Sequence, residues 1–119
     1  MDERSQFRVE LQRPSAQVAV VELAGEVDIY SSPQFADALR LGIDGGATRV
    51  VIDLAKVTFI DSTALGVVVG GIKRLRALRG TLDVVCEEEN LKRIFEITGL
   101  NTILGIYHTR AEALAAATK

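Results

Sequence analysis

The order of strand-like and helix-like patterns is the feature that most restricts the fold of this chain. Strand patterns at residues 7–12 and 18–23 flank a short turn, which predicts an antiparallel hairpin. From there on, helix and strand patterns alternate, and alternation implies parallel strands joined by right-handed crossovers. We therefore expect an α/β fold with a mixed, mostly parallel sheet that is opened by an N-terminal hairpin and packed with helices.

Local signals give the bounds of the elements after the hairpin. A hydroxyl cap at Ser31, with a proline two residues later, starts a first helix, which the glycines at 45–46 stop. A capping box at residues 109–112 precedes a last, alanine-rich helix. The segments between them are predicted as strand 48–54, helix 62–80, strand 81–86, helix 87–98 and strand 103–107. The order is β-β-α-β-α-β-α-β-α, and we expect residues 1–119 to form one domain.

Charge and hydropathy argue against two classes of partner. Fourteen Lys and Arg stand against sixteen Asp and Glu, so the net charge of −2 offers little attraction to nucleic acid or to an anionic membrane. The first residues are charged and contain no apolar signal segment, and no apolar run approaches the roughly 20 residues that span a bilayer. We expect a cytoplasmic protein that binds neither nucleic acid nor membrane.

The segment FIDSTALGVVVGG, residues 59–71, joins a buried strand to a helix and is the most unusual stretch of the chain. An Asp or Ser in front of a helix most often caps its free N–H groups and does nothing else. Here, however, Ser62, Gly66 and Gly70 recur every four residues and form a stripe almost without side chains. Glycines inside a helix cost roughly 1 kcal/mol each relative to alanine. Close approach of another protein would explain that cost, and so would tight packing inside the domain.

The sequence lacks the residue sets needed for serine catalysis, for receiver-type phosphorylation, and for binding a nucleotide or a metal. Ser62 as a nucleophile would need a general base, and His108, the one histidine, lies at the end of the last predicted strand with no motif that ties it to Ser62. Asp53 ends a central strand, as in a phospho-accepting receiver domain, but the accompanying acidic pair and lysine are missing, so a role in local hydrogen bonding is favoured. The sequence contains no phosphate-binding loop and no Cys/His cluster with metal-ligand spacing. We expect no enzyme activity, no metal and no cofactor.

Two further features have ordinary structural interpretations. Lys73, Arg74, Arg76 and Arg79 crowd the end of the helix that follows Ser62. Cations in the last turns favour the negative end of the helix dipole, so we expect a solvated cluster and not an anion site. Cys86, the single cysteine, ends an apolar run and is expected to be a small buried hydrophobic residue.

Three motifs together resemble the anti-sigma factor antagonists of the STAS domain family. They are GEVD at residues 25–28, VTFIDSTALGV at residues 57–67 and ITGL at residues 97–100, and the resemblance covers essentially the whole chain. In that family the unmodified antagonist binds an anti-sigma factor, a serine kinase related to histidine-kinase ATPase domains, and so releases a sigma factor. These proteins regulate bacterial sporulation and general stress responses. Phosphorylation of the motif serine ends binding, and a serine phosphatase restores it.

The resemblance implies a role for each matching residue. Ser62 would be the phosphoacceptor, with Thr63 as a possible secondary acceptor, and Asp61 would shape its surroundings. Asp28 would lie in the neighbouring loop of the same surface. ATP would be bound by the kinase partner and not by this chain. The partner-binding surface would consist of Asp28, Asp61, Ser62, Thr63, Gly66 and Gly70.

Two alternative functions remain open at this point. A ligand-sensing STAS module would bind a small molecule saturably as an isolated domain. A small serine enzyme would react at Ser62 with a serine-directed probe in the absence of any partner. For the oligomeric state, we expect a monomer or a weak dimer.

Overall fold

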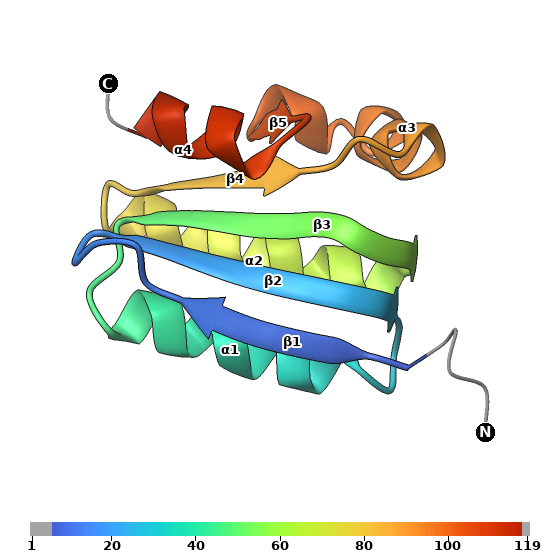
Figure 1. Ribbon diagram of the computed structural model, residues 1–119, viewed down its shortest axis with the longest axis horizontal. Coiled ribbons are helices and arrows are strands. Elements are labelled where there is room, and N and C mark those ends of the chain that lie inside the picture. Colours follow the sequence, from blue (N-terminus) through green and yellow to red (C-terminus); the bar gives the residue numbers. More distant parts are fainter. Residues whose placement is uncertain (1–5, 118–119) are drawn as a thin grey trace.

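The computed structural model describes residues 6–117, and at their centre is one five-stranded sheet with the strand order β1-β2-β3-β4-β5 (Figure 1). β1 pairs antiparallel with β2, and all later pairs are parallel, which confirms the predicted mixed sheet and its opening hairpin. The strands are β1 (Arg8–Gln12), β2 (Val18–Val27), β3 (Arg49–Ile60), β4 (Thr81–Val85) and β5 (Gly105–Tyr107). The helices are α1 (Ser32–Asp44), α2 (Ser62–Ala77), α3 (Glu89–Ile97) and α4 (Arg110–Ala117), with a short 3-10 helix η2 (Leu100–Thr102) before β5.

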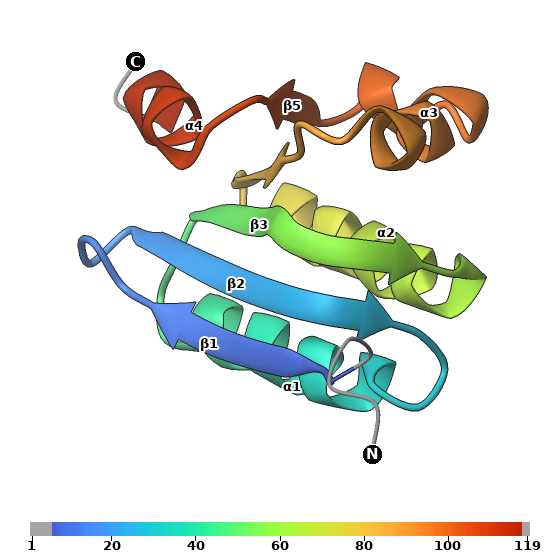
Figure 2. The ribbon, with the colours of Figure 1, turned by 45° about the vertical axis from the view of Figure 1, so that its right-hand side comes forward.

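The helices form layers on both faces of the sheet (Figures 1 and 2). Successive side chains of a strand point to opposite faces, so β3 directs Val50 and Ile52 into the main core under α1 and α2, and Val51 into a smaller core under α4. All three side chains are fully buried, as expected for a central strand covered on both faces. None of the helices within residues 6–117 has the length and apolarity needed to cross a membrane.

β2 and β3 extend well beyond the strands that the sequence predicts. β2 continues through Gly25 to Val27, and β3 continues to Ile60, with irregular register along the added part. Gly25 has a φ of 86°, and a side chain there would collide with the backbone of Gln6. The glycine and the acids of this segment indicate a loop in the sequence, but pairing with β3 overrides that preference. The extension carries the ends of both strands to the start of α2.

Several local predictions are confirmed and others need correction. The capping box of α4 forms in both directions, since Thr109 Oγ1 accepts from Glu112 N at 3.1 Å and Glu112 Oε1 accepts from Thr109 N at 3.2 Å. Cys86 is buried, and loss of solvent contact raises the pKa of its thiol to about 11. In contrast, α2 ends at Ala77 and not at Gly80, and the last strand begins at 105 and not at 103.

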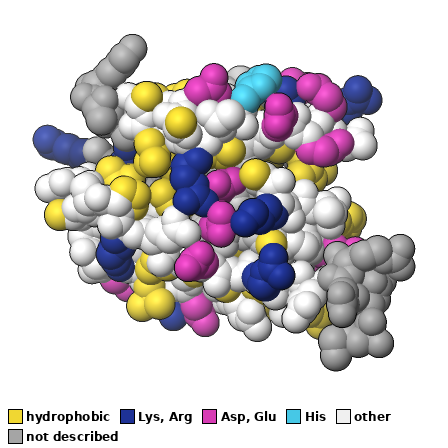
Figure 3. Space-filling view, viewed as in Figure 1, with side chains coloured by type: hydrophobic (Ala, Val, Ile, Leu, Met, Phe, Trp, Pro, Cys, Tyr) yellow, Lys and Arg dark blue, Asp and Glu magenta, His cyan; other side chains and the backbone are white. Residues whose placement is uncertain are grey.

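α4 is held on the sheet by its first residue. Arg110 donates from Nε to Asp53 Oδ2 at 2.9 Å, and from its other two nitrogens to Glu22 at 2.7 Å and Gln12 at 2.6 Å. Asp53 also accepts from the backbone N–H of Ala55 at 2.9 Å. Asp53 therefore has the structural role that the sequence favoured over a receiver-like one. Figure 3 shows side chains of both charge signs intermingled over this face of the sheet.

Candidate functional site

Asp61 caps α2 and fixes the position of the residues that follow. Its Oδ1 accepts from Ala64 N at 3.0 Å, and its backbone is extended, as is usual for a residue preceding a helix. The carboxylate also lies at the positive end of the helix dipole, which stabilises it. The cap that the sequence predicts is therefore present. It makes Ser62 and Thr63 the first two residues of a 16-residue helix.

The Ser62 and Thr63 side chains face solvent at the start of α2. Throughout residues 6–117, no group forms a hydrogen bond with either hydroxyl, although the neighbouring Asp61 is fully engaged as a cap. The first N–H groups of a helix and its dipole favour a negative group at this place. A hydroxyl here is reachable by another protein, and a phosphate added to it would be electrostatically tolerated by the helix.

Asp28 organises the loop between β2 and α1. Its Oδ1 accepts from the N–H groups of Tyr30 at 2.9 Å and Ser31 at 3.1 Å, and lies 3.2 Å from the Ser31 hydroxyl oxygen. Partial desolvation raises the pKa of Asp28, but the hydrogen bonds from Ser31 and Tyr30 outweigh it, so the pKa lies below its usual value. The loop is thus held most firmly when Asp28 is ionised.

The prediction that the Ser31 hydroxyl caps α1 is wrong. The hydroxyl turns back into the loop, where it donates toward the Glu26 carbonyl at 3.0 Å and accepts from Asp28 N at 2.9 Å. Ser31 still occupies the N-cap position, but its side chain makes no capping hydrogen bond. Because the Glu26 carbonyl and the Asp28 N–H offer competing partners, the side chain forms hydrogen bonds within the loop and not with the helix.

The extended strands bring the two acids to one end of the molecule. Val27 and Ile60 are partners in the β2–β3 pairing, and Asp28 and Asp61 are the residues that directly follow them. Asp61 N donates to the Val27 carbonyl at 3.2 Å, which ties the two chain segments together. The carboxyl ends of parallel strands meet at one edge of a sheet, and this is where α/β proteins most often place functional loops. Asp28, Asp61 and Ser62 thus share one surface, as the resemblance implies.

The glycines of α2 divide into two kinds. A Cβ on Gly71 would lie 2.7 Å from Leu39 Cδ2 and 3.0 Å from Leu82 Cδ1, so this glycine permits close packing against α1 and β4. A Cβ on Gly66 or Gly70 would meet no atom within 4 Å. Packing inside the domain therefore explains why residue 71 is a glycine, but it does not explain the glycines at positions 66 and 70. Their stripe leads from Ser62 into an apolar groove of about 350 Å³ between α1 and α2.

Three apolar residues are exposed at this end of the molecule, and the sequence does not single them out as surface residues. Ile29 and Tyr30 follow Asp28 and are 60% and 88% exposed, and Phe59 on β3 is 47% exposed. Phe59 lies opposite Glu26 in the β2–β3 pairing, which places it at the carboxyl ends of the strands. Exposed aromatic side chains are typical of protein interfaces. The signal in the sequence is an apolar Ile-Tyr pair inside a loop that is otherwise polar.

Comparison with known proteins places this geometry in a family. The sequence profile of the STAS domain matches residues 10–113. The anti-sigma-B factor antagonist of Listeria monocytogenes is 39% identical over 90 residues, which cover 76% of this chain and 79% of that protein. The anti-sigma-B factor antagonist of Bacillus subtilis is 41% identical over 87 residues, which cover 72% and 78%.

Solved structures share the fold at lower identity. An anti-sigma factor antagonist from Mycobacterium paratuberculosis matches with a TM-score of 0.88 and 24% identity, and the match covers all of both chains. The Bacillus cell fate determinant SpoIIAA in its phosphorylated form matches with a TM-score of 0.75 and 22% identity, over 92% of this chain and 99% of that one. Together with the sequence matches, they confirm the predicted fold and the resemblance: this chain belongs to the STAS domain family.

Proposed function

We propose that this protein is an anti-sigma factor antagonist that is controlled by phosphorylation of Ser62. The observation that carries the proposal is the exposed Ser62 hydroxyl, which forms no hydrogen bond within residues 6–117 and begins a glycine stripe in which a Cβ on Gly66 or Gly70 would meet no atom within 4 Å. The names of the relatives, which are anti-sigma-B factor antagonists at 39% and 41% identity, support it. The phosphorylated form of SpoIIAA, a protein of the same fold, gives further support.

In the unmodified state, an anti-sigma factor would dock over the start of α2. Gly66 and Gly70 leave the backbone of α2 open to close approach, and the exposed Tyr30 and Phe59 offer apolar area at the same end. Binding would occupy the anti-sigma factor and so release its sigma factor. The partner-binding residues that we assign are Asp28, Asp61, Ser62, Thr63, Gly66 and Gly70.

In the modified state, the same surface would carry a phosphate. The anti-sigma factor, acting as a serine kinase, would hold ATP, and the Ser62 oxygen would attack its γ-phosphorus, with ADP leaving and the hydroxyl proton passing to the kinase. The phosphate adds about −1.5 to −2 charges at the contact point. Asp61 and the Asp28 loop already make this surface acidic, so the added charge and bulk would weaken docking by roughly ten- to a hundred-fold. A serine phosphatase would restore the free hydroxyl.

The chain itself would contribute no catalytic group. The Asp61 carboxylate caps α2 and the Asp28 carboxylate holds its own loop, so both are engaged in structure. Within residues 6–117, no group that could act as a base hydrogen-bonds to Ser62, and His108 follows β5 at the far side of the sheet order. We therefore propose a binding module that serves as the kinase's substrate, in place of a serine enzyme.

The proposal is tested by capture of partners from a native lysate of the source organism on immobilised protein. Wild type, Ser62→Ala and Ser62→Asp are compared, with Thr63→Ala as the matched control at the neighbouring hydroxyl. We expect a kinase-type anti-sigma factor on all columns except Ser62→Asp. Incubation of that partner with ATP should then phosphorylate wild type at Ser62, as mapped by mass spectrometry. Equal recovery on all columns, or phosphate at Thr63 in place of Ser62, would contradict the proposed switch.

A further inference from the structure

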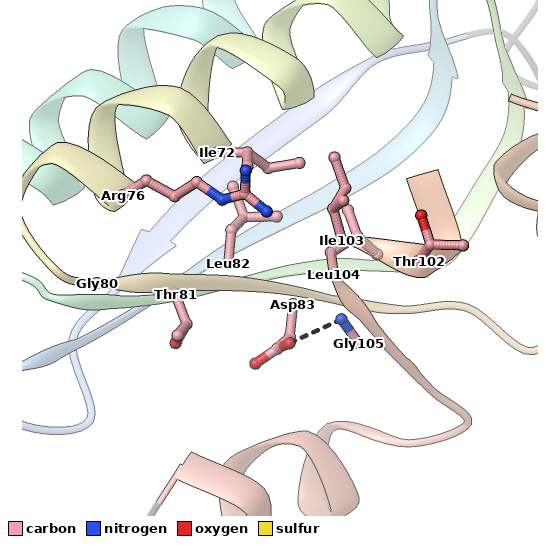
Figure 4. A pocket seen from close by; sticks show the side chains of 10 residues that line it. All are labelled: Ile72, Arg76, Gly80, Thr81, Leu82, Asp83, Thr102, Ile103, Leu104 and Gly105. Atoms are coloured by element: carbon pink, nitrogen blue, oxygen red, sulfur yellow. Dashed lines mark hydrogen bonds between the residues drawn. The ribbon is translucent and has the colours of Figure 1, made fainter. Parts of the chain in front are cut away.

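The C-terminal half of α2 borders a cavity that has no part in the proposed function. The cavity has a volume of about 410 Å³ and lies between α2, the start of β4 and the segment from η2 to β5 (Figure 4). Ser62 and this cavity lie at opposite ends of α2, roughly 20 Å apart at a rise of about 1.5 Å per residue. Cavities of this size hold small organic ligands. Its apolar walls are formed by Ile72, Leu82, Ile103 and Leu104.

One cation of the α2 cluster lies in this cavity. Figure 4 shows Arg76 extending from α2 above Leu82, with its guanidinium directed toward Ile103 and Leu104. Among the four cations at the end of α2, only Arg76 lines the cavity. Arg74 instead forms an ion pair with Asp44 at 2.6 Å. The sequence alone treats these cations as one solvated cluster, whereas the structure separates Arg76 from the rest.

The Arg76 guanidinium has no internal counter-ion. No acidic side chain or carbonyl in the part of the chain that the structure describes pairs with it. Asp83 also borders the cavity, but Figure 4 shows its carboxylate on the opposite side of β4. There it accepts from Gly105 N at 3.0 Å and pairs with Arg49 at 3.0 Å. The cavity therefore combines apolar walls and the polar Thr81 and Thr102 with one positive charge that no acid within residues 6–117 pairs with.

The donors at the cavity indicate which kind of anion fits. A phosphate site normally offers several free backbone N–H groups. Here the N–H groups of Gly80, Ile103 and Leu104 donate to carbonyls of the chain, and that of Gly105 donates to Asp83. Arg76 is the one cation among the lining residues, and its planar fork matches the two oxygens of a carboxylate.

We infer that this cavity is a binding site for a small carboxylate with an aliphatic tail. The carboxylate pairs with the Arg76 guanidinium, and the tail lies against Ile72, Leu82 and Leu104. Ile103, which is 43% exposed, is covered by the bound tail. Binding here does not involve Ser62, so the inference stands or fails separately from the proposed phosphorylation switch.

The probe for this site is 4-methylpentanoate, titrated into the isolated ¹⁵N-labelled domain and followed by backbone amide shifts. Its neutral analogue 4-methylpentanamide tests the charge, acetate tests the tail, and 3-methylbutyl phosphate tests the type of anion. We expect saturable shifts around Arg76, Leu82 and Ile103 with a Kd on the order of 1 mM, a reasonable affinity for so small a ligand. The amide and acetate should bind at least tenfold more weakly, and the phosphate no more tightly than the carboxylate.

Two variants assign the site to the guanidinium. Arg76→Gln removes the charge from an exposed side chain and should weaken 4-methylpentanoate at least tenfold, with the melting temperature unchanged. Lys73→Gln removes a cation from the same helix end, outside the cavity, and should leave the affinity unchanged. Shifts that do not saturate, equal binding of the amide, or equal loss in both variants would overturn the inference. Tighter binding of the phosphate would overturn the assignment to a carboxylate.

Discussion

The contact between α4 and the sheet contains acids from the middle of β2 and β3, and the start of α2 contains acids that directly follow the same strands, but the two regions use them differently. Under α4, Asp53 and Glu22 both pair with Arg110, and Glu22 also lies 3.8 Å from Lys56 Nζ. At the start of α2, Asp61 is satisfied by the helix, while the Ser62 hydroxyl beside it is left free. The first region is closed and holds the fold together. In the second region, the Asp28 and Asp61 carboxylates hold the backbone in place, and the Ser62 hydroxyl is accessible to another molecule.

The largest loss of stability should come from removing the Arg110 contacts between α4 and the sheet. Arg110→Ala would leave the nearly buried Asp53 without its cation and Glu22 with only Lys56, whose Nζ lies 3.8 Å away, so we expect a loss of about 3 kcal/mol in the free energy of unfolding. Denaturant titration measures it. Arg40→Ala, which breaks an exposed pair with Asp37, should cost less than about 1 kcal/mol. A loss in Arg110→Ala as small as that of Arg40→Ala would mean that α4 is held by its apolar contacts alone.

The glycines of α2 provide a comparison within one helix. Gly71→Ala forces a methyl group against Leu39 and Leu82 and should destabilise the domain by about 1 to 3 kcal/mol. Gly66→Ala meets no atom and should stabilise it by roughly 0.5 to 1 kcal/mol through helix propensity. Thermal unfolding distinguishes the two signs. If Gly66→Ala also weakens binding of the anti-sigma factor, Gly66 is part of the docking surface. An unchanged affinity would show that Gly66 lies outside that surface.

The smallest expected effect concerns the Asp28 loop and its dependence on pH. Because hydrogen bonds lower the pKa of Asp28 in the folded state, its contribution to stability is fully present above the unfolded pKa of about 3.9. That contribution is lost as the pH falls through the lower folded value. The difference in unfolding free energy between wild type and Asp28→Asn should therefore shrink below about pH 4. A difference that is constant from neutral pH to below the folded pKa would show that the charge of Asp28 does not hold the loop.

Much of the fold could be predicted because its signals are local. The Asp61 cap and the Thr109–Glu112 capping box depend on residues three positions apart, and the hairpin pairs residues that are eight to sixteen positions apart. The extension of β2 through Gly25 to Val27 could not be predicted in this way, because it depends on pairing with β3, more than thirty residues away. The direction of the Ser31 hydroxyl is set by the Glu26 carbonyl and the Asp28 N–H of the loop, which no helix signal in the sequence reports.

The candidate site likewise has features that depend on local sequence and features that depend on contacts between distant segments. The sequence singles out Ser62 and the stripe that follows it, but it cannot separate Gly66 from Gly71, because that distinction depends on where Leu39 of α1 packs. The exposed Tyr30 and Phe59 come from separate strand ends, and only the long β2–β3 pairing brings them to one surface. The sequence therefore identifies the hydroxyl at the start of the helix, but it does not show which residues from distant segments lie beside it.

The central claim is that one phosphate on Ser62 changes binding and leaves the fold intact. Its most direct test is titration calorimetry of the captured anti-sigma factor with the protein in two forms, unmodified and carrying phosphoserine at position 62. We predict at least tenfold weaker binding of the phosphorylated form, with an unfolding free energy within about 0.5 kcal/mol of the unmodified form. Equal affinities for the two forms would contradict the account and reduce Ser62 to the first residue of a helix.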